Sequence, residues 1–238
     1  MAKLYVVSDV HSFWNELKAA LDEAGFEPEN KEHWLVSCGD HFDRGPEPEK
    51  VMNYFKSLER KILIKGNHES MLLDCIQRRY PYKYDWSNGT AQTIIDLAPE
   101  ATTFDEACEM VYYKVKDFIG SMVNYFETDN YIFTHSCIPL KDDGLFNPDW
   151  RRVSHEAWED ARWGNPFDVA HKGLLPDKTL VFGHWHTSWP RHQYEGKPET
   201  GEGADFSIYY GDGYMGLDAC TAYSKKVNIL ILEDEFLK

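Results

Sequence analysis

Short apolar runs alternate with amphipathic stretches along the first 80 residues of the chain. The apolar runs predict strands at 5–7, 34–36 and 62–64. Apolar side chains recur at helical spacing between and after these runs, which predicts helices at 12–24, from Pro46 onward and at 68–79. Ser12 is expected to cap the first helix and Gly25 to end it. This order predicts parallel strands joined by right-handed crossovers.

The rest of the chain has a different pattern. Residues 90–127 are expected to be mostly helical, with an apolar stripe that faces a core. Further strands are predicted at 131–133 and 180–182, on either side of an irregular stretch at 138–177 that is rich in Pro and Trp. A polar stretch at 190–205 is interpreted as an exposed loop. Three β-rich runs, at 206–210, 214–217 and 227–232, predict an antiparallel end to the chain. With no repeat or linker in the sequence, we expect one domain over 1–238.

Composition narrows the class of protein. A hydrophobic content of 42% provides enough apolar surface for a large core and excludes general disorder. The 40 acidic residues outnumber the 25 basic ones, and the net charge of −15 disfavours a general nucleic-acid binder. No apolar run approaches the roughly 20 residues that span a bilayer, so no membrane partner is expected. The early Asp9 argues against a signal peptide, and five scattered cysteines indicate reduced thiols, so a cytoplasmic location is expected.

Ligand-type residues follow five of the predicted strands. They lie in the segments Ser8-Asp9-Val10-His11, Gly39-Asp40-His41-Phe42-Asp43-Arg44-Gly45, Gly66-Asn67-His68-Glu69, His135 and Gly183-His184-Trp185-His186. Sites in α/β sheets form outside the carboxyl ends of the strands, so these residues are expected to converge. Asp40 or Asp43 could instead cap the helix near Pro46. Helix capping does not explain why ligand-type residues follow all five strands.

The residue types point to metal chemistry on a phosphate. Carboxylate, imidazole and amide oxygen suit manganese, iron or zinc, and Asp40 could bridge two cations about 3.5–4 Å apart. Arg44 offers a planar cation to phosphate oxygens. His68 has the right chemistry to protonate a leaving alkoxide, and Asp43 could fix its tautomer.

These motifs resemble the signature of the calcineurin-like metallophosphoesterases, and their Asp-Arg-Gly and Asn-His-Glu variants resemble the phosphoprotein phosphatase branch. The resemblance implies an α/β fold, a four-layer α/β/β/α sandwich in which helices flank two packed mixed sheets. It also implies two divalent cations, with manganese first and iron, zinc or nickel as alternatives. Compact bacterial and phage members of this branch include protein phosphatases and diadenosine polyphosphate hydrolases.

The resemblance also assigns roles residue by residue. Metal ligands are expected at Asp9, His11 and Asp40 for the first ion, and at Asp40, Asn67, His135 and His184 for the second. His186 is either a further ligand or a residue of the rim. Phosphate is expected on Arg44, Asn67 and a second arginine, Arg162, for which Arg151 and Arg152 are rivals. His68, oriented by Asp43, is the expected general acid. His41 and Asp218 are expected to support ligands rather than bind metal, and Cys137 leaves a thiol near the site.

The function expected first is a serine/threonine protein phosphatase in which a metal-bound hydroxide attacks phosphorus in line. The alternative is hydrolysis of diadenosine tetraphosphate or another nucleotide. Asp43 and Glu69 favour the phosphatase, whereas Phe182-Gly183-His184-Trp185 favours the nucleotide hydrolase. A non-catalytic scaffold is disfavoured because none of the principal ligand positions is eroded. The expected partner is therefore a phosphorylated protein or a small phosphoester, and the sequence gives no oligomeric state.

Overall fold

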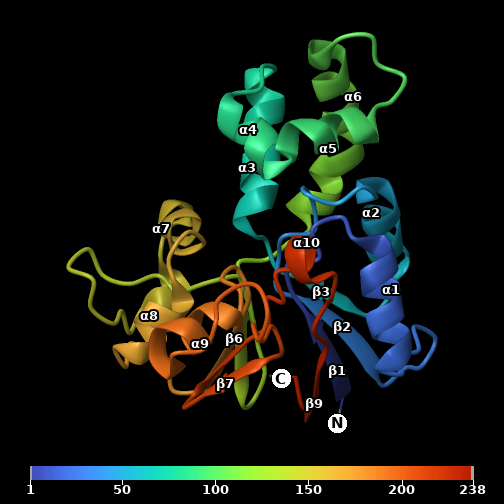
Figure 1. Cartoon of the computed structure of the whole chain (residues 1–238). Helices are drawn as coiled ribbons and strands as arrows, with labels where there is room; N and C mark the ends of the chain where they lie inside the picture. The colour runs from blue at the N-terminus through green and yellow to red at the C-terminus, as the bar shows by residue number, and fades with distance from the viewer. Residues whose placement is uncertain (1, 237–238) are drawn as a thin grey trace.

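Two β-sheets pack face to face and helices cover both outer faces (Figure 1). The structure, a computed structural model, describes residues 2–236. The first sheet has the order β3-β2-β1-β9, with β1 at Ala2–Val7, β2 at His33–Ser37, β3 at Lys61–Leu63 and β9 at Leu230–Asp234. The second has the order β4-β5-β6-β8-β7, with β4 at Tyr125–Glu127, β5 at Tyr131–Thr134, β6 at Thr179–Phe182, β7 at Tyr209–Gly211 and β8 at Tyr214–Gly216. Both sheets are mixed, as the expected sandwich requires.

Apolar side chains on the inner faces of the sheets form the layer between them. This layer includes Leu4, Val6, Val36, Phe133, Val181, Leu217 and Leu230, all of them buried. Because side chains alternate along a strand, their neighbours Tyr5, Val7 and Leu35 face the opposite way and pack beneath the helices of the first sheet. The alternation explains why such short strands carry apolar residues on both faces.

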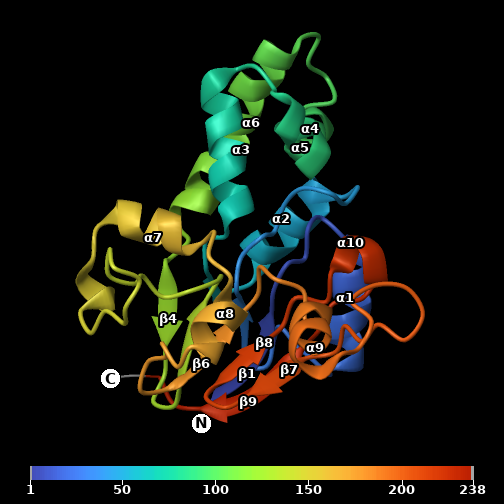
Figure 2. The same cartoon turned by 60° about the vertical axis from the view of Figure 1, so that its left-hand side comes forward.

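The helices divide between the two outer faces. The first sheet is covered by α1 (Trp14–Glu23) and α2 (Pro48–Ser57), which share an apolar cluster with α3 (Asn67–Arg78), α5 (Thr90–Leu97) and α6 (Phe104–Gly120). Helices α3 to α6, with α4 at Lys83–Asn88, rise above the ends of the strands as a helical cap (Figure 1). The second sheet is covered by α7 (His155–Ala161), α8 (Pro166–His171) and α9 (Ser188–Glu195), as Figure 2 shows. Two short elements, η1 (Trp150–Arg152) and α10 (Thr221–Ser224), complete the chain.

The strands predicted at 5–7, 34–36, 62–64, 131–133 and 180–182 and the parallel pairing of β1, β2 and β3 are confirmed. The runs predicted at 206–210 and 227–232 form strands only from 209 and 230, and two helix starts also differ. Ser12 does not cap α1, since its backbone φ is +62° and the residue at the N-cap is Phe13. The second helix begins at Pro48 rather than at Pro46. The backbone N–H of Glu47 donates to the carbonyl of Ser12, which holds the preceding turn outside the helix.

Three longer predictions also need correction. The helical region expected to 127 ends at Gly120, and 125–127 forms β4. The irregular stretch at 138–177 contains η1, α7 and α8. The exposed loop expected at 190–205 begins inside α9, where Arg191 is buried. Its guanidinium donates to the carbonyls of Thr187, Ser207 and Ile208, so a polar residue is satisfied inside the fold.

The antiparallel end of the chain is confirmed in part. Strands β7 and β8 form an antiparallel pair, but β8 also runs parallel to β6. The last strand leaves this sheet and pairs antiparallel with β1, with Leu232 opposite Leu4. All five cysteines are free, as expected for reduced thiols. Across residues 2–236, no helix combines the length and apolarity that crossing a bilayer requires.

Candidate metal centre

The ligand-type residues meet at the carboxyl ends of the strands. Asp9 follows β1, Asp40 follows β2, Asn67 follows β3, His135 follows β5 and His184 follows β6. Two groups of side chains converge there, one of His11, Asp40 and His68 and the other of Asp40, His135 and His184. Within each group the nitrogen and oxygen atoms lie within 4.8 Å of one another. Asp40 belongs to both groups, which is the arrangement required of a carboxylate that bridges two cations.

Backbone carbonyls fix the ring tautomers of two of these histidines. The Nδ1–H of His11 donates to the carbonyl of Phe42 at 2.9 Å, and that of His135 donates to the carbonyl of Cys38 at 2.7 Å. Both Nε2 atoms therefore present lone pairs to the site. Burial lowers the pKa of His135 and of His184 to about 3, so both rings are neutral at pH 7, as metal ligands must be.

In the second group, hydrogen-bond acceptors face one another with no hydrogen atom between them. His135 Nε2 lies 2.8 Å from Asn67 Oδ1 and 3.4 Å from Asp40 Oδ1. Near the first group, burial raises the pKa of Asp9, and the negative charges of Asp218 and Asp40 raise it further. Buried carboxylates and imidazole lone pairs that face one another need positive charge between them. The residues present therefore fit two hard or borderline divalent cations.

Asp9 stands slightly apart from its expected partners. Its Oδ1 lies 3.9 Å from His11 Nε2, and neither three-residue group includes it. The carboxylate accepts hydrogen bonds from the Ser8 hydroxyl and from the backbone N–H of His184 at 2.9 Å. The first group instead contains His68, which the sequence indicated as an acid and not as a ligand.

Asp43, His68 and Arg44 form a connected chain at the mouth of the site. Asp43 Oδ2 accepts from His68 Nδ1 at 2.7 Å and from the hydroxyl of Thr90 at 2.6 Å. The guanidinium nitrogens of Arg44 lie 3.1 Å from His68 Nε2 and 2.8 Å from His11 Nε2. Arg44 is nevertheless exposed to solvent. Burial lowers the pKa of His68, but Asp40 and Asp43 raise it more, so the net shift is upward. Asp43 therefore holds Nδ1 of His68, and Nε2 faces the Arg44 guanidinium.

Glu69 connects the two loops that carry Asp40 and Asn67, a role that the sequence reasoning missed. It is fully buried and accepts from the backbone N–H groups of Asp40 at 3.1 Å, His41 at 2.8 Å and Gly66 at 2.7 Å. Its Oε1 also lies 3.2 Å from His41 Nδ1, which gives His41 the supporting position expected of it. The detectable signal was a glutamate three residues after the N-cap of a helix.

The backbone of the site is held in unusual conformations. Positive φ angles occur at six of the predicted site residues, namely Asp9, His11, Asp40, Asp43, Arg44 and His184. Such angles cost of order 1–3 kcal/mol each and persist only where the surroundings impose them. The neighbouring loops are also very close, since a Cβ on Gly183 would lie 2.0 Å from Asp9 Oδ2 and one on Gly66 would lie 2.1 Å from Asp40 Oδ1. Glycine is therefore required at both positions.

The remaining predicted residues occupy several environments. His186 does not join either three-residue group, because its ring faces the Ser188 hydroxyl at 2.9 Å and Glu199 at 3.4 Å. Asp218 is buried beside the centre, where burial raises its pKa to about 6. Cys137 Sγ would lie 2.8 Å from a Cβ on Gly164, and burial raises the pKa of this thiol to about 12.

The candidate phosphate arginines differ in their partners. Arg162 is buried and donates from Nε to the carbonyl of Lys65 at 3.0 Å. Its NH1 lies 2.5 Å from Glu159, and its NH2 donates to Asn124 Oδ1. Arg151, its rival, forms two hydrogen bonds with Glu127 at 2.8 and 2.7 Å on β4.

The chain was compared with family models and with curated proteins, and both comparisons find phosphoester hydrolases. The model of the calcineurin-like phosphoesterase family matches residues 2–206. Over 70 residues the chain is 40% identical to a symmetrical bis(5'-nucleosyl)-tetraphosphatase of Hamiltonella defensa and 36% identical to that of Erwinia tasmaniensis. Each match covers 29% of this chain and 25% of the relative, so the chain aligns with a quarter of these curated relatives.

Solved structures share the fold at low sequence identity. A candidate diadenosine tetraphosphatase superposes with a TM-score of 0.61 at 16% identity, over 100% of this chain and 95% of the other. A protein serine/threonine phosphatase from Saccharomyces cerevisiae gives a TM-score of 0.55 at 12% identity, over 100% and 81%. At these identities the superpositions support a shared fold and nothing finer.

Proposed function

Since this chain belongs to the calcineurin-like phosphoesterase family, we propose that it is a metal-dependent phosphatase that acts on phosphoserine and phosphothreonine. The observation that carries the finer proposal is the buried pair of His68 and Asp43, whose nitrogen and oxygen lie 2.7 Å apart. A serine or threonine alkoxide is a poor leaving group and needs a proton, whereas a nucleoside polyphosphate leaves with little assistance. An acid positioned by Asp43 is therefore most useful to a phosphomonoesterase.

The residues of the site have three proposed roles: metal binding, phosphate binding and proton donation. Asp9, His11 and Asp40 would hold one cation, and Asp40, Asn67, His135 and His184 the other. When bound, the cations lower the pKa of a water and offset the charge of the phosphate. Arg44 presents its exposed guanidinium to the equatorial phosphate oxygens, and Arg162 is the candidate for a second clamp. His68 donates its Nε2 proton to the leaving oxygen while Asp43 holds Nδ1.

Relatives named as symmetrical bis(5'-nucleosyl)-tetraphosphatases support a second candidate, hydrolysis of a dinucleoside polyphosphate. A turnover panel with added Mn²⁺ distinguishes the two. It contains a phosphoserine peptide, diadenosine tetraphosphate and p-nitrophenyl phosphate. The proposed function predicts the highest kcat/KM on the peptide, and a strong preference for the dinucleotide would overturn it.

The role of His68 is tested with His68→Asn in the same panel. We expect kcat for the phosphoserine peptide to fall by about 10²-fold, because the leaving alkoxide loses its acid. The p-nitrophenyl phosphate rate should fall much less, since its phenolate leaves without a proton. His192→Asn, at an exposed histidine on α9, is the matched control. An equal loss on both substrates would show that His68 is not the acid.

A further inference from the structure

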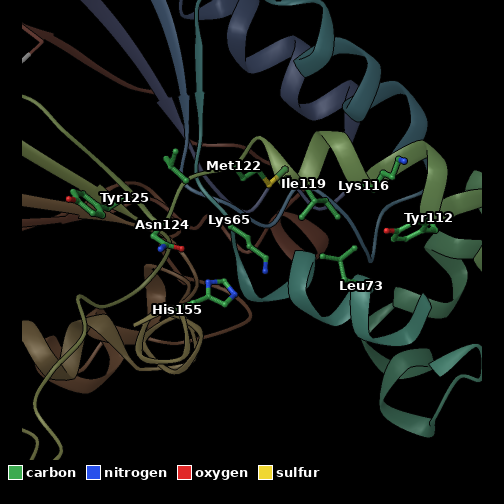
Figure 3. Close-up of a pocket in the computed structure, with 11 residues that line it drawn as sticks. Lys65, Leu73, Tyr112, Lys116, Ile119, Met122, Asn124, Tyr125 and His155 are labelled. Atoms are coloured by element: carbon green, nitrogen blue, oxygen red, sulfur yellow. The ribbon is translucent and has the colours of Figure 1, made fainter. Parts of the chain in front are cut away.

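A groove of about 700 Å³ lies between the helical cap and α7 (Figure 3). Leu73, Ile119 and Met122 provide an apolar surface, and basic groups are distributed along the lining. Figure 3 shows Lys65 and His155 close together, with Lys116 farther along toward Tyr112. None of the eleven lining residues, all within the described part of the chain, is acidic, although the sequence has 40 acidic residues against 25 basic ones.

The groove begins close to the metal centre along the chain. Lys65 stands two residues before Asn67, and two residues of chain span at most about 7 Å. Asn124, on the opposite wall, accepts a hydrogen bond from Arg162, which also donates to the carbonyl of Lys65. A peptide with its phosphate on the cations would therefore have only a short distance to bridge to reach Lys65.

The groove retains positive charge after its internal ion pairs are formed. Glu159 is the carboxylate at its α7 end and lies 3.0 Å from Lys65, 3.2 Å from His155 and 2.5 Å from Arg162. One carboxylate thus serves two permanent cations and a histidine. Within residues 2–236, Lys116 has no carboxylate at ion-pair distance, and its ammonium lies over the ring of Tyr113 at 5.2 Å. The carboxylate of an anionic ligand would therefore give Lys116 an ion-pair partner.

We propose that this groove binds an acidic segment of a phosphoprotein next to the phosphorylated residue. The inference rests on the proposed phosphatase activity and adds a preference for acidic flanking sequences. Carboxylates of the segment pair with Lys116 and Lys65, while its aliphatic parts lie on Leu73 and Ile119. The strong negative charge of the rest of the chain makes this patch selective, because acidic peptides are repelled elsewhere.

The test compares phosphoserine peptides of one sequence whose flanking positions carry either Glu or Gln, on either side of the phosphoserine. The wild-type protein, loaded with Mn²⁺, is expected to give a kcat/KM at least about threefold higher on one of the Glu peptides. Lys116→Gln should remove most of this preference, and Lys116→Glu should reverse it, with a total change of about tenfold. Lys226→Glu, an exposed lysine beside α1, is the matched charge control and should leave the preference unchanged.

The outcomes separate the two levels of the proposal. If Glu and Gln peptides are turned over equally, or if the preference survives Lys116→Glu, the groove does not bind acidic segments while the phosphatase proposal stands. If p-nitrophenyl phosphate or diadenosine tetraphosphate is hydrolysed but no phosphopeptide is, both proposals fail. A preference that is reduced by raising the salt concentration and lost in Lys116→Gln supports the groove.

Discussion

Glu69→Gln is the perturbation that most directly tests how the site is held together. The carboxylate accepts four hydrogen bonds, two on each oxygen, from Asp40, Gly66 and His41. In the glutamine variant, an NH₂ group replaces one of the two carboxylate oxygens. The two N–H groups that donated to that oxygen then have no acceptor inside the fold. Hydrogen bonds to charged groups contribute about 1.5–3 kcal/mol each, which gives a loss of about 3–6 kcal/mol in the free energy of unfolding.

Urea unfolding in the presence of EDTA measures this loss, since the chelator removes the contribution of bound metal. Glu69→Asp retains the charge and provides a milder variant if the amide prevents folding. Glu233→Gln, on the exposed side of β9, is the control and should change the free energy of unfolding by less than about 0.5 kcal/mol. A loss below about 1 kcal/mol for Glu69→Gln would refute the account of Glu69 as the link between the two loops.

The same variant has a predictable pH dependence. Burial alone would raise the pKa of Glu69, but the His41 ring and hydrogen bonds from His41 and Gly66 hold it well below its usual range. Its stabilisation is therefore complete above the pKa of an unfolded glutamate, about 4.3, and declines as the pH falls below that value. The difference in unfolding free energy between wild type and Glu69→Gln should narrow on acidification below about pH 4, and a constant difference would contradict this reasoning.

Three further predictions follow from single contacts. Gly183→Ala, whose Cβ would lie 2.0 Å from Asp9 Oδ2, is expected to displace that carboxylate and weaken Mn²⁺ binding by about 10- to 100-fold in calorimetric titration. Asp40→Asn should remove tight binding of both ions and abolish turnover together, because this carboxylate belongs to both ligand groups; retention of one tight site would show that it does not bridge. Asp234→Asn should lower the free energy of unfolding by about 2 kcal/mol in urea, since it accepts from the Thr128 hydroxyl at 2.7 Å, and an unchanged midpoint would exclude this role.

Local signals in the sequence were sufficient for most of the fold and for the members of the site. Asp9 and Asp40 could be placed near each other because each follows an apolar strand of one parallel pair, and parallel strands end at one edge of a sheet. The supporting contacts could not be derived in the same way. Glu69 binds backbone groups from three separate positions, and such bonds leave only a weak trace in the side-chain pattern.

Other differences between the predictions and the structure have a different physical origin. Arg191 is a polar residue whose donors are satisfied inside the fold, so polarity wrongly included 190–195 in the loop, whereas 196–205 forms no helix or strand. His186 lies two residues from His184, but the backbone turns at His184 with φ of +66° and directs His186 toward Glu199. Spacing along the chain does not report such a turn, which depends on how the loops pack.

The pairing of β9 with β1 affects how the protein acquires its site during synthesis. Leu4 lies opposite Leu232, and the hydroxyl of Thr221 donates to the carbonyl of Asp9 at 2.9 Å. Because ribosomes deliver the N-terminal strand first, Asp9 lacks this anchor until more than two hundred further residues have emerged. Contacts of such high sequence separation form slowly, so a nascent chain passes through a stage with an unpaired edge on β1.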